Sequence, residues 1–164
     1  MDESEARRLV DSYADMIVRI GCNYLKERFD AEDVCQEVFL SFLSENRSFE
    51  SETHEKAWII RTTINICKNH LKCAFIRHTV PLETAEEMPA SAEQALEFPE
   101  AMKSLPENYR ITLYLHYFEG YSVKEIASIL GKRENTVSAW LSRGRKKLKH
   151  ILSEDSKGVV IHEG

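Results

Sequence analysis

The stretch that decides the fold runs from Ser122 to Lys149 and reads SVKEIASILGKRENTVSAWLSRGRKKLK. Its first part places apolar residues at i, i+3, i+4 and i+7, which is the spacing of one face of a short helix. Ser122 and Glu125 are spaced as a capping box, and Gly131 stands where a glycine ends a helix. A second apolar stripe of helical periodicity follows, on Val137, Leu141, Leu148 and Leu152. The stretch therefore predicts a helix-turn-helix.

The second predicted helix carries small polar and basic side chains away from its apolar stripe. Small polar groups can reach base edges in a DNA groove, and cations can bind phosphates. These residues are Asn135, Thr136, Ser138, Ser142 and Arg143, followed by Arg145, Lys146, Lys147 and Lys149. The pattern indicates DNA binding, although an ordinary helical hairpin with a solvated basic face has the same pattern.

The net charge of −5 is unevenly distributed along the 164 residues. Residues 101–164 hold 11 Lys and Arg against 7 Asp and Glu, a net charge of +4. Residues 1–73 have a net charge of −4, and residues 74–100 one of −5. Since nonspecific DNA binding depends on neutralising phosphates, the acidic remainder favours a protein partner or limited DNA affinity of the chain alone.

Glycine and proline are sparse and strand-like alternation is scarce, so the composition predicts an all-α protein. We expect two small helical domains, an N-terminal helical bundle and a C-terminal helix-turn-helix domain, joined by a flexible acidic linker. The expected segments are a first domain at 1–78, the linker at 79–96, a second domain at 97–153 and a flexible tail at 154–164.

A helix in the first domain is expected from about Ala31 to Ser44, with Asp30 as its N-cap. One of its faces is apolar and would pack in the core. The opposite stripe, again at helical spacing, consists of Asp33, Gln36, Glu37 and Leu40. This stripe is either a solvated surface with a stray leucine or a docking face in which polar groups surround one apolar anchor.

The next predicted helix, from about His54 to Ile76, has a cationic and hydrogen-bonding face that suits a DNA strand. This face holds Trp58, Arg61, Thr62, Asn65, Lys68 and Lys72. It could equally be a solvated face with Trp58 packed into the bundle. The polar connector before it contains Arg47 and Phe49, and that aromatic ring either anchors in the core or stacks on a base.

Nothing in the sequence indicates a metal or cofactor site. Cys67, His70 and Cys73 have a suggestive spacing, but positions i and i+6 of one helix point to different faces, and a closed zinc site needs four ligands. No apolar run approaches a membrane span, and no signal peptide precedes the first helix. We therefore expect a cytoplasmic protein whose four cysteines are reduced.

Three motifs in order resemble one known family. They are Ala31-Glu32-Asp33-Val34-Cys35-Gln36-Glu37-Val38-Phe39; Ala57-Trp58-Ile59 running to Asn65; and Leu105-Pro106, Tyr109-Arg110, Phe118-Glu119-Gly120-Tyr121-Ser122, Glu125-Ile126-Ala127 and Thr136-Val137. Together they resemble the two-domain bacterial RNA polymerase sigma factors of the extracytoplasmic-function (ECF, group 4) type. The chain departs from the family pattern at Asn69, Lys72, Arg133, Trp140 and Gly144.

The resemblance implies a function for each face. The first motif would dock on the clamp helices of the polymerase β′ subunit through Asp33, Gln36, Glu37 and Leu40. The second motif and the connector before it would recognise and open the promoter −10 element through Arg47, Phe49, Trp58, Arg61, Thr62, Asn65 and Lys68. The helix-turn-helix would read the −35 element through Glu134, Asn135, Thr136, Ser138, Ser142, Arg143 and Lys146.

The resemblance further implies that the second domain contacts the β flap, that an anti-sigma factor is a partner, and that the chain is not an enzyme. Promoter DNA is then the ligand, with no cofactor, no metal and no membrane insertion. One alternative is a stand-alone helix-turn-helix regulator, which typically binds paired half-sites as a dimer. Another is a metal- or thiol-dependent enzyme. The sequence does not show the converging triad, the carboxylate pair or the Gly-rich phosphate loop that such an enzyme would need.

Overall fold

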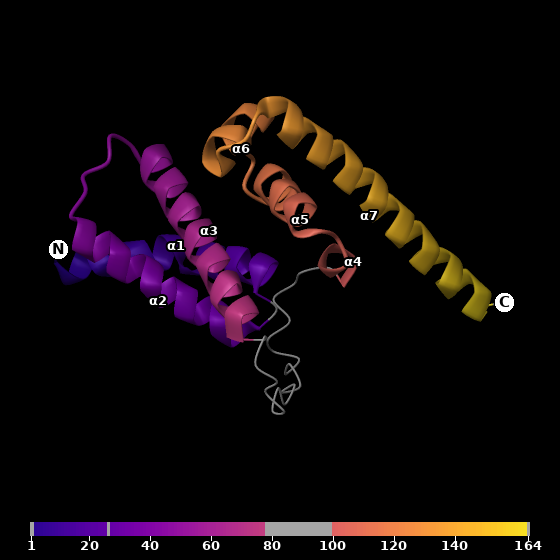
Figure 1. Cartoon of the computed structure of the whole chain (residues 1–164), viewed down its shortest axis with the longest axis horizontal. Coiled ribbons are helices and arrows are strands. Elements are labelled where there is room, and N and C mark those ends of the chain that lie inside the picture. Colours follow the sequence, from indigo (N-terminus) through magenta and orange to yellow (C-terminus); the bar gives the residue numbers. More distant parts are fainter. Residues whose placement is uncertain (1, 26, 78–99, 164) are drawn as a thin grey trace. The chain divides into compact units, whose positions relative to one another are not determined.

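The computed structural model describes residues 2–25, 27–77 and 100–163, which form helices and no strand. The chain divides into two compact units, a first unit at Met1–Leu96 and a second unit at Glu97–Gly164. Figure 1 shows their helices in indigo to magenta and in orange to yellow, respectively. The prediction of an all-α protein is confirmed, and the predicted linker at 79–96 lies outside the described residues.

The first unit is a bundle of three helices, α1 (Glu3–Tyr24), α2 (Arg28–Glu45) and α3 (Glu52–Arg77), each packed against the other two. Branched aliphatic side chains fill its centre, including Ile17, Ile20, Val34, Val38, Ile59 and Ile60. Gly21 allows α1 to approach α2, because a Cβ added there would lie 2.7 Å from the Cβ of Ala31.

Helix α2 begins one turn earlier than the sequence indicated. Asp30 was expected to be its N-cap, but the N-cap is Glu27, which makes no side-chain capping hydrogen bond. The prediction was wrong because the first turn has another source of stability. The Arg28 guanidinium lies 3.0 Å from the Glu32 carboxylate, an i, i+4 pair across that turn. Phe29 is therefore part of the helix rather than of the preceding loop.

The second unit consists of α4 (Glu100–Lys103), α5 (Glu107–Leu113), a π-helical turn η2 (Tyr114–Phe118), α6 (Val123–Leu130) and α7 (Glu134–Glu163). Helices α4, α5 and α6 all pack on α7. Side chains of α5 and η2 fill the core together with those of α6 and α7, including Ile111, Leu113, Tyr114, Leu115, Ile126 and Val137.

Local signals set the ends of these helices. Ser122 and Glu125 form the predicted capping box at the start of α6, with hydrogen bonds of 3.2 and 3.1 Å. Gly131 ends α6 in the left-handed conformation with φ 65°, and the Lys132 amide donates to the Ala127 carbonyl at 2.9 Å. The predicted helix-turn-helix is thus confirmed, with α6 and α7 as its two helices.

Helix α7 is longer than the sequence indicated. The tail was expected from residue 154 onward, but backbone helix continues to Glu163, because no proline interrupts the propagating hydrogen bonds. Val137 and Leu141 of its apolar stripe are buried, whereas Leu152 is 50% exposed. Leu152 therefore lies on a surface, although the periodicity placed it with the core.

Candidate polymerase and nucleic-acid interfaces

The outer face of α2 combines acidic and amide groups with exposed apolar side chains. Gln36, Glu37 and Leu40 are exposed and Asp33 is half-buried, so the predicted stripe lies on the surface of the bundle. The Leu40 side chain is 63% exposed. A monomeric bundle gains nothing from an apolar side chain in water, so such a residue is a candidate anchor for a partner.

Two further apolar residues extend this face, and sequence reasoning did not include them. Phe29 is 68% exposed and Leu43 is 48% exposed. Phe29 lies four residues before Asp33, and Leu43 three after Leu40, so helical spacing adds both to the same side. Phe29 was missed because Asp30 looked like the N-cap. We call Phe29, Asp33, Gln36, Glu37, Leu40 and Leu43 the α2 face.

His70 of α3 reaches the edge of the α2 face. Its Nε2 lies 3.0 Å from Oε1 of Glu37, so the Glu37 carboxylate has a partner from the neighbouring helix. This contact also gives the His70 ring a protein partner in place of a metal ion. Cys67 is fully buried while Cys73 is exposed, so the three side chains do not converge. No group of ligands in the described part of the chain could hold a metal ion.

The cysteines are thiols, and Cys35 is buried in the first unit. Burial raises the pKa of the Cys35 thiol to about 11, with smaller contributions from Glu32 and Asp15. A nucleophilic cysteine needs the opposite shift, because the thiolate is the reactive form. Cys35 therefore has the environment of a packing residue.

An aromatic cluster joins α2, the connector and α3. The rings of Phe42 and Phe49 stack with centroids 5.6 Å apart, and Trp58 lies 5.7 Å from each of them. Phe49 is thus packed against the bundle, yet it keeps a half-exposed surface. Asn46 ends α2 with φ 46°, a left-handed turn that directs the chain into the connector with Arg47 and Phe49.

A pocket of about 430 Å³ opens beside this cluster. It lies where the start of α1, the end of α2, the connector and the first turn of α3 meet. Its lining residues are Glu5, Arg8, Phe42, Arg47, Ser48, Phe49, Ser51, Glu52 and Glu55. Arg47 and Phe49 were predicted to contact DNA, whereas Arg8 and the three glutamates were not. We call this cavity the connector pocket.

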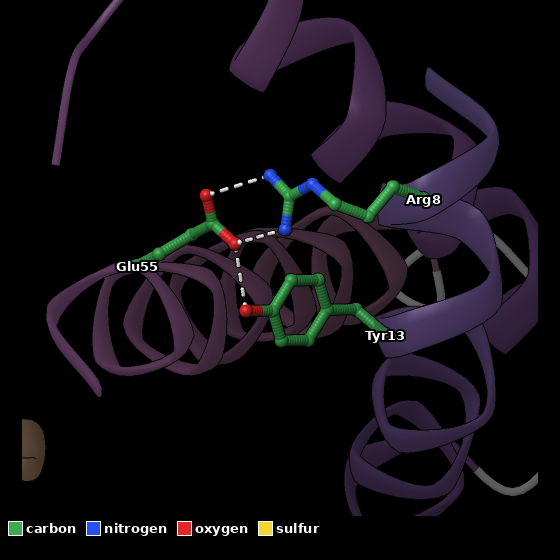
Figure 2. Close-up of polar contacts among 3 residues, drawn as sticks. All are labelled: Arg8, Tyr13 and Glu55. Atoms are coloured by element: carbon green, nitrogen blue, oxygen red, sulfur yellow. Dashed lines mark hydrogen bonds and ion pairs between the residues drawn. The ribbon is translucent and has the colours of Figure 1, made fainter. Parts of the chain in front are cut away.

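Glu55 is the centre of a polar network between α1 and α3, shown in Figure 2. Arg8 donates to both carboxylate oxygens, at 3.0 Å and 3.1 Å, and the Tyr13 hydroxyl donates to Oε1 at 2.7 Å. Glu55 is 7% exposed, so its charge is well shielded from water. A buried carboxylate persists only with such partners. We call Arg8, Tyr13 and Glu55 the α1–α3 network.

The network changes the protonation of its members. Hydrogen bonding from Arg8 holds the pKa of the Glu55 carboxyl below its usual value, against the opposing effect of burial, and the Tyr13 hydroxyl adds to the lowering. Burial, followed by the hydrogen bond to Glu55, raises the pKa of Tyr13. Glu55 is therefore ionised and Tyr13 neutral at neutral pH.

The remaining residues of the predicted −10 face follow α3 away from the pocket. Arg61, Asn65 and Lys68 are exposed, and Thr62 is half-buried. Trp58, at the start of the row, belongs to the aromatic cluster instead of standing free. The structure thus places Arg47, Phe49 and Trp58 together at one end of α3, with the other four residues along the helix beyond them.

The predicted recognition residues all lie on α7. Glu134, Asn135, Ser138, Arg143 and Lys146 are exposed, and Thr136 and Ser142 are half-buried. Val137, Leu141 and Gly144 are buried on the other side of the helix. Gly144 is in close contact with α5, because a Cβ there would lie 3.2 Å from side-chain atoms of Tyr109 and Leu113. An alanine at this position would crowd that contact.

A groove of about 560 Å³ lies between α5, η2 and the later part of α7. Leu113, Leu148 and Leu152 line it, with Tyr117 along one edge. The Arg145 guanidinium donates to the Tyr117 hydroxyl at 3.1 Å. Arg145 and Lys149 give the groove a basic margin, so it suits an amphipathic segment that carries acidic groups.

Known protein families match both units. Residues 9–74 match Sigma-70 region 2, and residues 95–148 match Sigma-70 region 4. The chain is 30% identical over 135 residues to the ECF RNA polymerase sigma factor SigM of Mycobacterium tuberculosis, covering 80% of this chain and 69% of the relative.

The chain belongs to the ECF family of RNA polymerase sigma factors. It is also 28% identical over 144 residues to the RNA polymerase sigma factor SigV of Bacillus subtilis, with 84% of each chain covered. This sigma factor shares its fold with RpoE of Bartonella quintana, solved with the anti-sigma factor NepR, at a TM-score of 0.71 and 20% identity, covering 90% of this chain and 96% of the other. CnrH, solved with the cytosolic domain of CnrY, has a TM-score of 0.65 at 18% identity, covering 94% and 91%. The family is not a class of enzymes.

Proposed function

We propose that this sigma factor binds core RNA polymerase through the α2 face. Three exposed apolar side chains flank an amide and two carboxylates there, which is the composition of a protein-binding patch with a central anchor. Leu40 would be the anchor on the β′ clamp helices, with Asp33, Gln36 and Glu37 providing charge and hydrogen bonds. His70 would hold the Glu37 carboxylate in place through their 3.0 Å contact.

The connector pocket and the adjoining face of α3 would bind the melted −10 element. A flipped base needs an aromatic surface for stacking and polar groups for its edge. Phe49 offers the first and Arg47 the second, and both line the pocket. Arg61, Thr62, Asn65 and Lys68 would continue along α3 as contacts to the strand, while Trp58 would support Phe49 from behind.

The second unit would bind duplex DNA at the −35 element through the exposed face of α7. Its recognition residues would be Glu134, Asn135, Thr136, Ser138, Ser142, Arg143 and Lys146. The groove beside Tyr117 would receive the β flap, whose helix would have to bring acidic groups to Arg145 and Lys149. We place the working domains at residues 1–78 and 97–153, with 79–96 as the connection.

The chain would act in the bacterial cytoplasm, where polymerase is, and would supply no catalytic group of its own. Anti-sigma control is part of the proposal, since RpoE, which has this fold, was solved with an anti-sigma factor. The single observation that carries the proposal is that one chain joins a region 2 match to a region 4 match.

Transcription with purified components tests this function. The full chain is added to core polymerase and genomic DNA, and the 5′ ends of the transcripts are mapped. We expect new start sites that share two upstream elements and depend on both core and chain. A chain that neither binds core nor directs initiation would contradict the proposal. Tight binding of the free chain to paired half-sites would instead support a stand-alone regulator.

A further inference from the structure

Arg8 of α1 lines the connector pocket, and no sequence motif assigned a role to this residue. Arg8 lies 39 positions before Arg47, so no local pattern links the two side chains. Both nevertheless line the same cavity, together with Phe49. A residue in that position can contact whatever the pocket holds.

Arg8 is held in one orientation. Two parallel hydrogen bonds, at 3.0 Å and 3.1 Å, fix its guanidinium plane on the Glu55 carboxylate, and the Tyr13 hydroxyl also donates to Oε1 of that carboxylate (Figure 2). A guanidinium has five N–H donors, so three remain outside this fork. The Arg8 side chain is 43% exposed, so it remains accessible.

A planar donor group fixed in this way selects its ligand by geometry. It fits a partner with two adjacent acceptors, as in the pairing of arginine with O6 and N7 of guanine. Cytosine has an equivalent pair in N3 and O2. Adenine and thymine lack a pair of adjacent acceptors, because a donor group or a carbon lies between the acceptors on each edge of these bases. The pocket's carboxylates, at Glu5 and Glu52, can accept from an exocyclic amine.

We propose that Arg8 is a specificity-determining residue of the connector pocket. Its guanidinium recognises an unpaired cytosine or guanine of the melted strand, and Glu55 and Tyr13 hold that guanidinium in the required plane. The inference rests on the proposed −10 function of the pocket. Within it, α1 becomes part of promoter recognition, and Glu55 and Tyr13 become positioning residues.

The test uses holoenzyme assembled from core polymerase and the full chain. The DNA is a fork junction whose upstream duplex comes from a mapped promoter and whose nontemplate overhang is randomised. Bound and unbound molecules are sequenced to give base preferences at each position. The wild type should prefer cytosine or guanine by about tenfold at one position. Arg8→Lys, which keeps the charge but loses the fork, should reduce that preference to about twofold or less.

One control variant and one variant of a positioning residue complete the test. Arg7→Lys alters a neighbouring exposed arginine that pairs with Glu3 and does not line the pocket, and it should keep every preference. Tyr13→Phe removes one hydrogen bond of the network without touching the pocket lining, so it should lower the base preference, but by less than Arg8→Lys does. Core affinity and unfolding of each variant are recorded alongside.

The outcomes separate the possibilities. A uniform loss of affinity in Arg8→Lys, with the base preference intact, would mean that Arg8 binds a phosphate or only supports the fold, and the inference would fail while the proposed function stood. A full wild-type base preference in Tyr13→Phe would overturn the positioning role of the network. If wild-type holoenzyme shows no base preference at any overhang position, the −10 assignment of the pocket fails, and the inference fails with it.

Discussion

The polar contacts inside the two units of this sigma factor differ in how far apart in the sequence their partners lie. In the first unit, the α1–α3 network joins Glu55 to Arg8 across 47 positions and to Tyr13 across 42. In the second unit, the contacts of Ser122 with Glu125 and of Tyr114 with Glu119 at 2.8 Å are local, and the contact of Arg145 with Tyr117, which spans 28 positions, is exposed. A buried charge therefore stabilises one unit, and caps and turns define the other.

This difference bears on function. The first unit has to form a pocket from elements that are distant in sequence, and a charged network can fix their relative positions. In the proposed function, the second unit presents one helix to duplex DNA, so it needs a rigid turn and a well-marked helix start. The same contrast predicts which substitutions harm which unit.

Each unit contains one tryptophan, Trp58 in the first and Trp140 in the second, so their unfolding can be followed separately. A Trp140→Phe background leaves Trp58 as the reporter of the first unit. A Trp58→Phe background leaves Trp140 as the reporter of the second.

The largest expected effect is that of Glu55→Ala on the first unit. The change leaves the Tyr13 hydroxyl and the Arg8 guanidinium without their shared acceptor, and we expect a loss of about 2–3 kcal/mol in the free energy of unfolding. Arg8 is partly exposed, which keeps the cost below that of a fully buried pair. Urea titration of Trp58 fluorescence measures it.

Glu52→Ala is the matched control, since Glu52 is in the same first turn of α3 but is exposed and outside the network. It should change the free energy by less than about 0.5 kcal/mol. Equal effects of the two substitutions would show that the network contributes no special stability.

Two glycine substitutions compare helix packing in the units. Gly21→Ala places a Cβ 2.7 Å from Ala31 Cβ, an overlap with little room to relax. Overpacking destabilises the first unit, and the higher helix propensity of alanine offsets part of that loss. We expect a net decrease of about 1–2 kcal/mol in its free energy of unfolding. Gly144→Ala meets side-chain atoms at 3.2 Å, which can shift, so its net effect should stay within about 1 kcal/mol. Thermal unfolding of both variants tests the order, and a costlier Gly144→Ala would reverse it.

Arg143→Ala should affect DNA binding by the second unit and leave core binding unchanged. Removing an exposed base or phosphate contact on α7 should weaken −35 duplex binding by holoenzyme about tenfold. Lys103→Ala removes the same charge from α4 and should have a much smaller effect. A −35 footprint unaltered by Arg143→Ala would exclude that contact.

The smallest effect is the acid dependence of the first unit. The depressed pKa of Glu55 in the folded state contributes stability that is full above the unfolded value of about 4.3 and is lost as the pH falls through the folded-state pKa. Between about pH 6 and pH 3, unfolding followed by Trp58 should lose more free energy in the wild type than in Glu55→Gln. Parallel curves for the two proteins would contradict this.

Sequence reasoning succeeded where the signals were local. The capping box and Gly131 predicted the helix-turn-helix, and helical periodicity predicted the surface position of Leu40. It failed at the start of α2, because Asp30 resembled an N-cap, and Phe29 was lost from the α2 face as a result. Arg8 and Glu55 could not be paired from the sequence, because their contact depends on how α1 and α3 pack.

Core binding by the α2 face tests the central assignment most directly. Labelled wild-type chain on core polymerase is displaced by an unlabelled variant carrying Gln36→Ala and Glu37→Lys, and by the control Glu3→Lys, whose side chain is 92% exposed. Because Glu37→Lys also removes the His70 contact, Trp58 unfolding is recorded to show that the bundle is intact. We predict that the double variant binds core at least about tenfold more weakly while the control matches the wild type. Unchanged core affinity in a folded double variant would contradict the assignment.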